Sequence, residues 1–200
     1  YDQAVSYLFL ALHTLEKKPN DSVFVKLKIT LYNDIGSMLQ YLNRPDKAIY
    51  YLSIGEQLAK SKKQFPTLAS LYVNFGNAYR QKDDWTRSWA YLHQAVSLAN
   101  KYQNLFVLQV PYLSLSNGFI TKDESDSAIF WLKKATALTG NLNPYMSKAM
   151  SGITLGNIYL DKNDVKQAAL YGEKALAQGL ALQAPQTVCL AHEILSKAYS

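Results

Sequence analysis

The sequence has one cysteine in 200 residues, so the chain cannot form an internal disulfide. Cys189 stands between Val188 and Leu190, a setting that suits a small buried side chain better than a reactive thiol. No apolar run approaches the ~20 residues that a membrane-spanning helix requires, and no charged-then-apolar leader opens the chain. We therefore expect a soluble segment without membrane contact, and its compartment, cytoplasm or periplasm, stays open.

The sequence also lacks the common signatures of catalysis and cofactor binding. It contains no G-x-G-x-x-G, G-x-x-x-x-G-K-S/T, G-x-S-x-G or H-E-x-x-H segment, and no pair of Cys or His has metal-ligand spacing. Acidic groups such as Asp83 with Asp84 lack the alternation, central Gly and closing Glu of a calcium loop. We expect a protein that is not an enzyme and that needs neither a cofactor nor a metal.

Positive charge is in excess but is not concentrated. The chain carries 21 Lys and Arg against 15 Asp and Glu, a net charge of +6. The lysines form short, scattered groups such as 17–18, 62–63 and 133–134 rather than a stripe, which favours solvated helix faces over contacts with nucleic acid. The first residue is Tyr1, already within an amphipathic pattern, so we expect a piece of a longer protein.

What the sequence does contain is a repeat of forty residues, the kind of period that marks a solenoid or an array. Two positions in each repeat hold small residues and a third holds a large aromatic one. The first small position is Gly36, Gly76, Ser116, Gly156 and Ser196; the second is Ala48, Ser88, Ala128 and Ala168; the aromatic position is Tyr51, Tyr91, Trp131 and Tyr171. Apolar spacings of three, four and seven around these positions predict helices, and no alternation of period two indicates strands.

Each repeat is therefore predicted to be an antiparallel helix pair, in an all-α fold. The repeats cover about 23–62, 63–102, 103–142 and 143–182, with half repeats at 1–18 and 183–200, in one domain over 1–200. First helices are predicted near 23–42, 66–82, 106–121, 144–161 and 185–199, and polar inner turns near 43–45, 82–84, 122–124 and 162–164 should cap the second helices. Pro66, Pro144 and Pro185 mark helix starts, and Gly140 and Gly179 suit helix exits. Pro111 predicts a kink or a late start in the third copy.

Two segments resemble the tetratricopeptide repeat (TPR). One is Phe75-Gly76-Asn77-Ala78-Tyr79 with Trp85, Ser88 and Ala95, and the other is Leu155-Gly156-Asn157-Ile158-Tyr159 with Ala168 and Ala175. The resemblance implies a right-handed superhelical solenoid. The usual period is 34 residues. Because the twelve-residue step across the inner turn is kept, the six additional residues lie between a second helix and the next first helix, and they lengthen those helices or their loop.

The resemblance also implies a concave groove that holds an extended peptide. The polar residues expected to line it are Asn33, Ser37, Asn74, Asn77, Arg80, Asn117, Thr154 and Asn157, and Val73 is expected to face it as well. An asparagine amide offers donors and an acceptor to an extended backbone, as a peptide ligand requires. An asparagine can equally bond within its own repeat, and both interpretations stay open for Asn77, Asn117 and Asn157.

Variants with a longer period are similar to the TPR modules of bacterial signalling proteins, including sensor kinases and peptide-responsive regulators. The function expected is thus a non-enzymatic protein- or peptide-binding module, the sensory or regulatory part of a larger signalling protein. The alternative is a structural scaffold that self-associates through uncapped ends. The last half repeat, with Val188, Ile194, Leu195 and Tyr199, lacks a covering helix and is expected to expose apolar surface.

Overall fold

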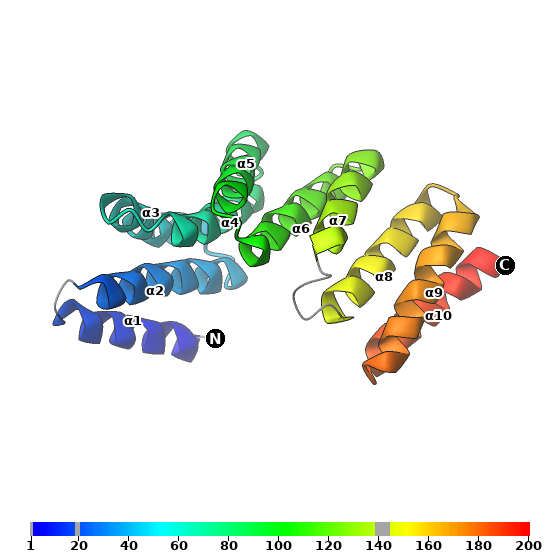
Figure 1. The fold of residues 1–200 in the computed structure, drawn as a ribbon, viewed down its shortest axis with the longest axis horizontal. Helices are drawn as coiled ribbons and strands as arrows, with labels where there is room; N and C mark the ends of the chain where they lie inside the picture. The colour runs from blue at the N-terminus through cyan, green and yellow to red at the C-terminus, as the bar shows by residue number, and fades with distance from the viewer. Residues whose placement is uncertain (1, 19–20, 139–144) are drawn as a thin grey trace. The chain divides into compact units, whose positions relative to one another are not determined.

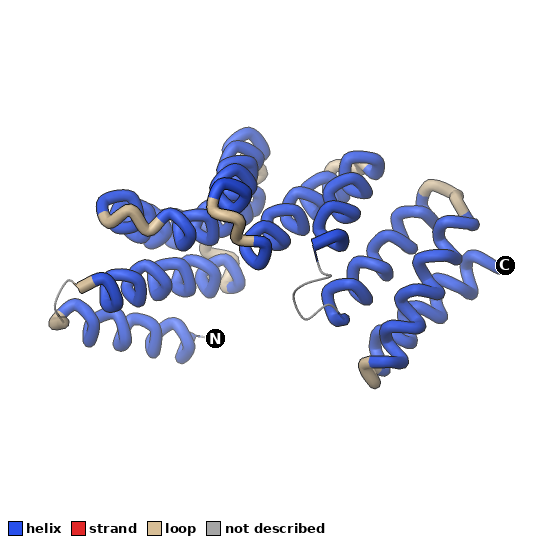
Figure 2. Tube along the Cα trace, viewed as in Figure 1, coloured by secondary structure: helices blue, strands red, loops and turns tan. Residues whose placement is uncertain are grey.

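A computed structural model describes residues 2–18, 21–138 and 145–200 of the chain. Every regular element in these ranges is an α-helix, and short turns join the helices (Figures 1 and 2). The ten helices of the described ranges are α1 (Asp2–Glu16), α2 (Ser22–Tyr41), α3 (Pro45–Ser61), α4 (Phe65–Gln81), α5 (Trp85–Lys101), α6 (Leu105–Thr121), α7 (Ser125–Leu138), α8 (Tyr145–Asp161), α9 (Val165–Ala181) and α10 (Pro185–Tyr199).

The helices pack as sequential antiparallel pairs, which confirms the all-α fold of helix hairpins. Each of α1 to α4 packs against the helix that follows it, and so does each of α7 to α9. In addition, α2 packs against α4 and α8 against α10, so the first helices of successive repeats are neighbours. The chain divides into two compact units, residues 1–114 (unit 1) and 115–200 (unit 2).

Every described turn from α2 to α7 and from α8 to α10 has the same three-residue form. In the α4–α5 turn the Asp83 N–H donates to the Arg80 carbonyl at 3.0 Å, and the Asp84 N–H donates to the Tyr79 carbonyl at 2.9 Å. These two bonds make a Schellman motif, which requires a left-handed residue after the helix. That residue has φ between 50° and 59° in each turn. The seven such residues are Asn43, Lys63, Asp83, Gln103, Asp123, Asn163 and Gln183, and consecutive ones are twenty or forty residues apart.

This regularity shows where the six additional residues of each repeat lie. The outer turn at 62–64 is as short as the inner turn at 82–84, whereas α3, α4 and α5 each have 17 residues. The additional residues therefore lengthen the helices and not the loop. The first helices begin and end within two residues of the predicted bounds.

Two of the helix-boundary predictions need correction. Gly179 does not end a helix: it lies inside α9, where an added Cβ would stand 3.1 Å from methyl groups of Thr187 and Val188. The residue is small because α10 approaches α9 closely at this point. The late helix start at Pro111 is also wrong, because α6 begins at Leu105 and contains the proline. Pro66 and Pro185 do stand at helix starts, whereas Pro144 and Gly140 lie outside the described residues.

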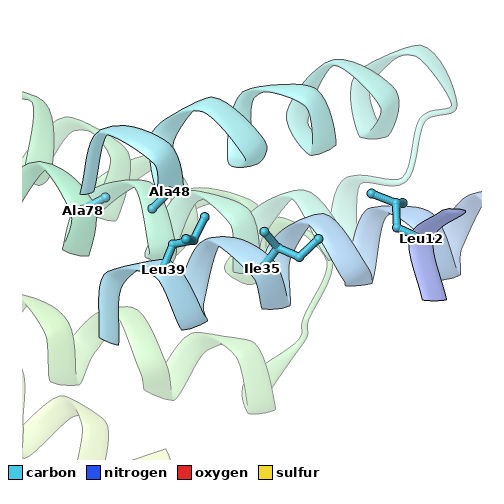
Figure 3. Close-up of a cluster of buried hydrophobic side chains, with 5 residues drawn as sticks. All are labelled: Leu12, Ile35, Leu39, Ala48 and Ala78. Carbon is cyan, nitrogen blue, oxygen red and sulfur yellow. The ribbon is translucent and has the colours of Figure 1, made fainter. Parts of the chain in front are cut away.

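The small positions let paired helices approach each other. An added Cβ on Gly36 would lie 2.5 Å from Cδ2 of Leu52, and one on Gly76 would lie 2.6 Å from Cγ of Leu92. In the repeat of Gly156 the position of these leucines holds Gly172, and Ile194 of α10 fills the space beside Gly156 instead. The first repeat buries Ile35 and Leu39 of α2 with Ala48 of α3, in a cluster that also contains Leu12 and Ala78 (Figure 3).

The last half repeat exposes less apolar surface than its sequence predicts. Ile194 is 2% exposed, because it packs with Ile153, Ala175 and Ala191. Val188 and Leu195 are half-buried against α9, and only Tyr199 of the four predicted residues is exposed, at 69%. The preceding helix pair, α8 and α9, thus covers most of the apolar face of α10, although no second helix follows α10 in this sequence.

Acidic residues at two inner turns cap the second helix that follows, as their positions predict, whereas the N-cap residue of α3, Arg44, makes no side-chain cap bond. Oδ1 of Asp84 accepts the backbone N–H of Arg87 at 3.0 Å, and Asp164 accepts that of Gln167 at 3.1 Å, so both cap a second helix. An ion pair between Lys162 and Asp126 at 2.7 Å joins the turn after α8 to α7 of the preceding repeat. No group of three or more His, Cys, Asp or Glu in the described ranges is arranged to hold a metal ion.

Candidate binding groove

The first helices of unit 1 line a groove of about 160 Å³. Its walls come from one helical face each of α2, α4 and the beginning of α6, where residues three or four apart lie side by side. The lining residues are Asn33, Ser70, Val73, Asn74, Val107 and Val110. The lining thus combines two amides and a serine hydroxyl with the apolar side chains of three valines.

The two asparagines of this groove bond to each other. Nδ2 of Asn74 donates to Oδ1 of Asn33 at 2.9 Å, and it also lies 3.4 Å from the Asn33 carbonyl oxygen. Beside them, burial raises the pKa of Asp34 above its ordinary value of 3.8, and a hydrogen bond from Asn33 offsets part of this rise. The bond between Asn33 and Asn74 therefore joins α2 to α4 and fixes the orientation of both amides.

Asn77 and Arg80 follow Asn74 along the same helix. Asn77 is half-buried, and its side-chain amide makes no hydrogen bond within the described part of the chain. Arg80 is half-buried as well; its Nε is fully buried and has no hydrogen-bond acceptor among the described residues. It is also the only charged side chain of α4. This helix therefore presents an amide and a cation whose bonding capacity the repeats do not use.

The remaining predicted site residues also lie on first helices, but they differ in whether their side chains are already hydrogen-bonded. Ser37 is exposed on α2. In unit 2, Asn117 on α6 and Asn157 on α8 are exposed, and the hydroxyl of Thr154 donates to the Met150 carbonyl of its own helix at 3.0 Å. Thr154 thus has its donor satisfied locally, whereas the amides of Asn117 and Asn157 bond to none of the described residues.

Sequence reasoning missed three lining residues of the groove: Ser70, Val107 and Val110. Ser70 stands one helical turn before Asn74, and Val110 stands forty residues after Ser70, at the same repeat position. The forty-residue register could have identified this pair. Val107 carries no such signal, because a valine near a helix start is as common in a core as in a groove.

The aromatic position of the repeat contributes to packing and not to the groove. The ring of Tyr91 stacks on Tyr79 at 5.5 Å and on Phe75 at 4.6 Å, and Tyr171 stacks on Tyr159 at 5.6 Å. Such contacts join the second helix of a repeat to its first helix, as the recurrence predicts. Of the helices described, none is long and apolar enough to cross a membrane.

Comparisons with known proteins support the fold. No protein-family model matches the sequence, and no curated protein matches it either. Among solved structures, BtubC (BKLC) from P. vanneervenii superposes with a TM-score of 0.77 at 15% identity, over 99% of this chain and 89% of that one. A protein of Podosopora anserina described as a kinesin light chain with nearly identical TPR-like repeats superposes with a TM-score of 0.70 at 14% identity, over 86% of this chain and 85% of that one. The chain therefore has the fold of the TPR-like repeat proteins.

Proposed function

We propose that the chain is a protein- or peptide-binding module and that an extended polypeptide binds to the first helices of unit 1. The observation that carries this proposal is the groove between α2, α4 and α6, together with the unused amide of Asn77 and the unused guanidinium N–H of Arg80. A buried donor without an acceptor costs about 1–3 kcal/mol, and a ligand oxygen would remove this cost. The site therefore favours a ligand that brings acceptors.

The groove suits a peptide with one apolar side chain and a nearby acidic group. Val73, Val107 and Val110 would contact the apolar side chain, and Arg80 would pair with the carboxylate. Because Asn33 and Asn74 hold each other in place, the peptide would meet amides that are already oriented and would lose less entropy on binding. In unit 2, Asn117 and Asn157 would offer amides of the same kind.

We further propose that the chain is the sensory or regulatory part of a larger bacterial signalling protein, such as a sensor kinase or a transcription regulator. The support for this context is the similarity of the forty-residue repeat to modules of that kind. Reading the sequence of the complete gene tests it directly: a kinase or DNA-binding domain in the same protein is the expected result.

The binding proposal can be tested with peptides selected from a displayed random library on the purified chain. We expect selected peptides to carry Asp or Glu, and calorimetry should show at least tenfold weaker binding to a variant with Asn77→Ala and Arg80→Ala, since a charge-assisted bond and an amide bond are lost. Asn100→Ala on the exposed face of α5 is the matched control and should bind as the unmodified chain does. Equal affinity for all three proteins would refute a site at Asn77 and Arg80.

A second candidate function is self-association, and an apolar groove between α1 and α2 favours it. This groove of about 530 Å³ is lined by Tyr7, Leu10, Ala11, Thr14, Leu15, Leu27 and Leu31. Tyr7 is 71% and Leu10 61% exposed, unusually high fractions for large apolar side chains that lie together. In light scattering, mass that rises with protein concentration and returns to the monomer value in Leu10→Asp would support a scaffold; a constant monomer mass would exclude it.

A further inference from the structure

A cavity in unit 2 stands where other repeats hold a tyrosine. It has a volume of about 250 Å³ and lies between α7, α8 and α9. Its lining residues are Thr136, Gly152, Leu155, Tyr171, Lys174 and Gln178. The forty-residue register aligns Gly152 with Tyr32, Tyr72 and Tyr112, and with His192 in the last half repeat. The cavity thus opens at the one copy of this position that has no side chain.

Unit 1 shows what fills the equivalent space. Tyr72 is 5% exposed, its ring lies 5.5 Å from the ring of Tyr91, and Nζ of Lys60 lies 6.0 Å from its centroid. Its hydroxyl interacts with the side chains of Glu56 and Lys60, which form an ion pair at 2.7 Å. A shift of eighty residues carries Tyr91 to Tyr171 and Glu56 to Thr136. The aromatic wall and a polar side chain are therefore kept in unit 2, while the phenol that they would hold is missing.

One position of the unit 2 cavity is polar where the other repeats are apolar. Gln178 stands where the other repeats have Leu58, Leu98 and Leu138. Its Oε1 is buried and has no hydrogen-bond partner among the described residues. Nζ of Lys174 lies 5.0 Å from the centroid of the Tyr171 ring, so a cation borders the same space. A buried acceptor without a donor is unfavourable, and a ligand hydroxyl would satisfy it.

We propose that this cavity binds a phenol group, which is supplied by a small aromatic compound or by a tyrosine side chain of a bound polypeptide. The phenol ring packs against Tyr171 and Leu155, over the backbone of Gly152, and its hydroxyl donates to Oε1 of Gln178. The ligand takes the place that Tyr72 occupies in unit 1. This cavity shares no lining residue with the groove of unit 1, so each proposal can be tested and refuted without the other.

NMR titration of the isotope-labelled 200-residue chain with p-cresol and with toluene tests the proposal. We expect saturable shifts at Gly152 and Gln178 with a dissociation constant on the order of 1 mM for p-cresol, a reasonable value for so small a ligand. Toluene, which has no hydroxyl, should bind several-fold more weakly. No saturable shift at these residues, or equal affinity for the two compounds, would overturn the proposal.

Gly152→Tyr supplies the missing side chain and is the most direct variant. An added Cβ at this position would stand 3.2 Å from Cβ of Ala175, so α8 and α9 need to separate by only a few tenths of an ångström. We expect the variant to lose the p-cresol shifts. Retained shifts would show that p-cresol binds elsewhere and would also overturn the proposal.

Gln178→Leu keeps the cavity and gives it the residue of the other repeats, so it serves if Gly152→Tyr does not fold. We expect p-cresol to bind this variant no better than toluene does, at least threefold more weakly than it binds the unmodified chain. Undiminished p-cresol binding would contradict the role of Gln178. A capped Gly-Tyr-Gly peptide identifies the source of the phenol. If the peptide binds as tightly as p-cresol, the natural ligand is a tyrosine of a polypeptide. If p-cresol binds and the peptide does not, the natural ligand is a free aromatic compound.

Discussion

Nδ2 of Asn74 donates a hydrogen bond to Oδ1 of Asn33 at 2.9 Å, and this bond joins α4 to α2 across 41 residues. Both side chains are half-buried in the wall of a groove, where water replaces a lost partner poorly. Three residues further along α4, Asn77 has no such bond within the described part of the chain. Two asparagines on one helix thus have different roles, the first in holding the repeats together and the second in offering a free amide.

This difference predicts different effects on stability. Asn74→Ala should lower the free energy of unfolding by about 1 kcal/mol, because it removes one inter-repeat hydrogen bond. Asn77→Ala should change it by less than about 0.5 kcal/mol, since no native bond is lost. Urea unfolding followed by circular dichroism measures both. An equal loss in the two variants would mean that Asn77 bonds within its own repeat and does not serve a ligand.

Two buried serines at the small positions of the repeat make a second matched pair. The Ser116 hydroxyl donates to the Ala128 carbonyl at 3.0 Å, whereas the buried Ser88 hydroxyl has no partner among the described residues. Ser88→Ala should therefore raise the free energy of unfolding by about 1 kcal/mol, and Ser116→Ala should lower it by a similar amount. Thermal melting of both variants tests the signs, and destabilisation by Ser88→Ala would show that its hydroxyl is satisfied in solution.

The sequence predicts the helices well because the apolar period is strong and recurs at a fixed register. It could not show where the six additional residues of each repeat lie. The outer turns contain neither Gly nor Pro at the decisive position, where Lys63, Gln103 and Gln183 take a left-handed conformation that such residues rarely adopt. Without a turn signal, a longer loop and longer helices predict the same spacing of apolar residues.

The groove was predicted only in part, for a geometric reason. Asn33 and Asn74 bond across neighbouring helices although they are 41 residues apart, and so they occupy different positions of the repeat. In the register Asn33 aligns with Val73, and Asn74 aligns with Asp34. Comparison of equivalent positions identifies residues that share an environment, but it does not identify diagonal partners between successive helices.

Asp84 predicts a dependence of stability on pH. The backbone N–H of Arg87, and then the guanidinium of the same residue, lower the pKa of Asp84 below its ordinary 3.8. A carboxylate whose pKa is lower in the folded state stabilises the fold above about pH 4, and this contribution is lost as the pH falls through the folded-state pKa. Asp84→Asn keeps a capping oxygen but cannot titrate.

The unmodified chain should therefore be more stable than Asp84→Asn at pH 7, and the difference should disappear well below pH 3.8. Urea unfolding of both proteins at several pH values measures this difference. Arg87→Met is a useful second variant, because it removes the ion pair and leaves the backbone N–H, so part of the pH dependence should remain. A constant difference between the unmodified chain and Asp84→Asn at all pH values would show that Asp84 does not titrate as its contacts predict.

The left-handed residues of the outer turns predict a simple stabilising substitution. Lys63 has φ of 54°, a conformation that costs a non-glycine residue about 1 kcal/mol and glycine almost nothing. Lys63→Gly should therefore raise the free energy of unfolding by about 0.5–1 kcal/mol, after allowance for the greater freedom of glycine in the unfolded chain.

Lys62→Gly is the control: it removes a lysine charge one residue earlier, where φ is −103° and glycine relieves no backbone strain. This control should be destabilised by about 0.5–1 kcal/mol. Thermal unfolding of the two variants should thus move in opposite directions, and a common shift would show that loss of the lysine charge, and not the backbone conformation, controls the stability of this turn.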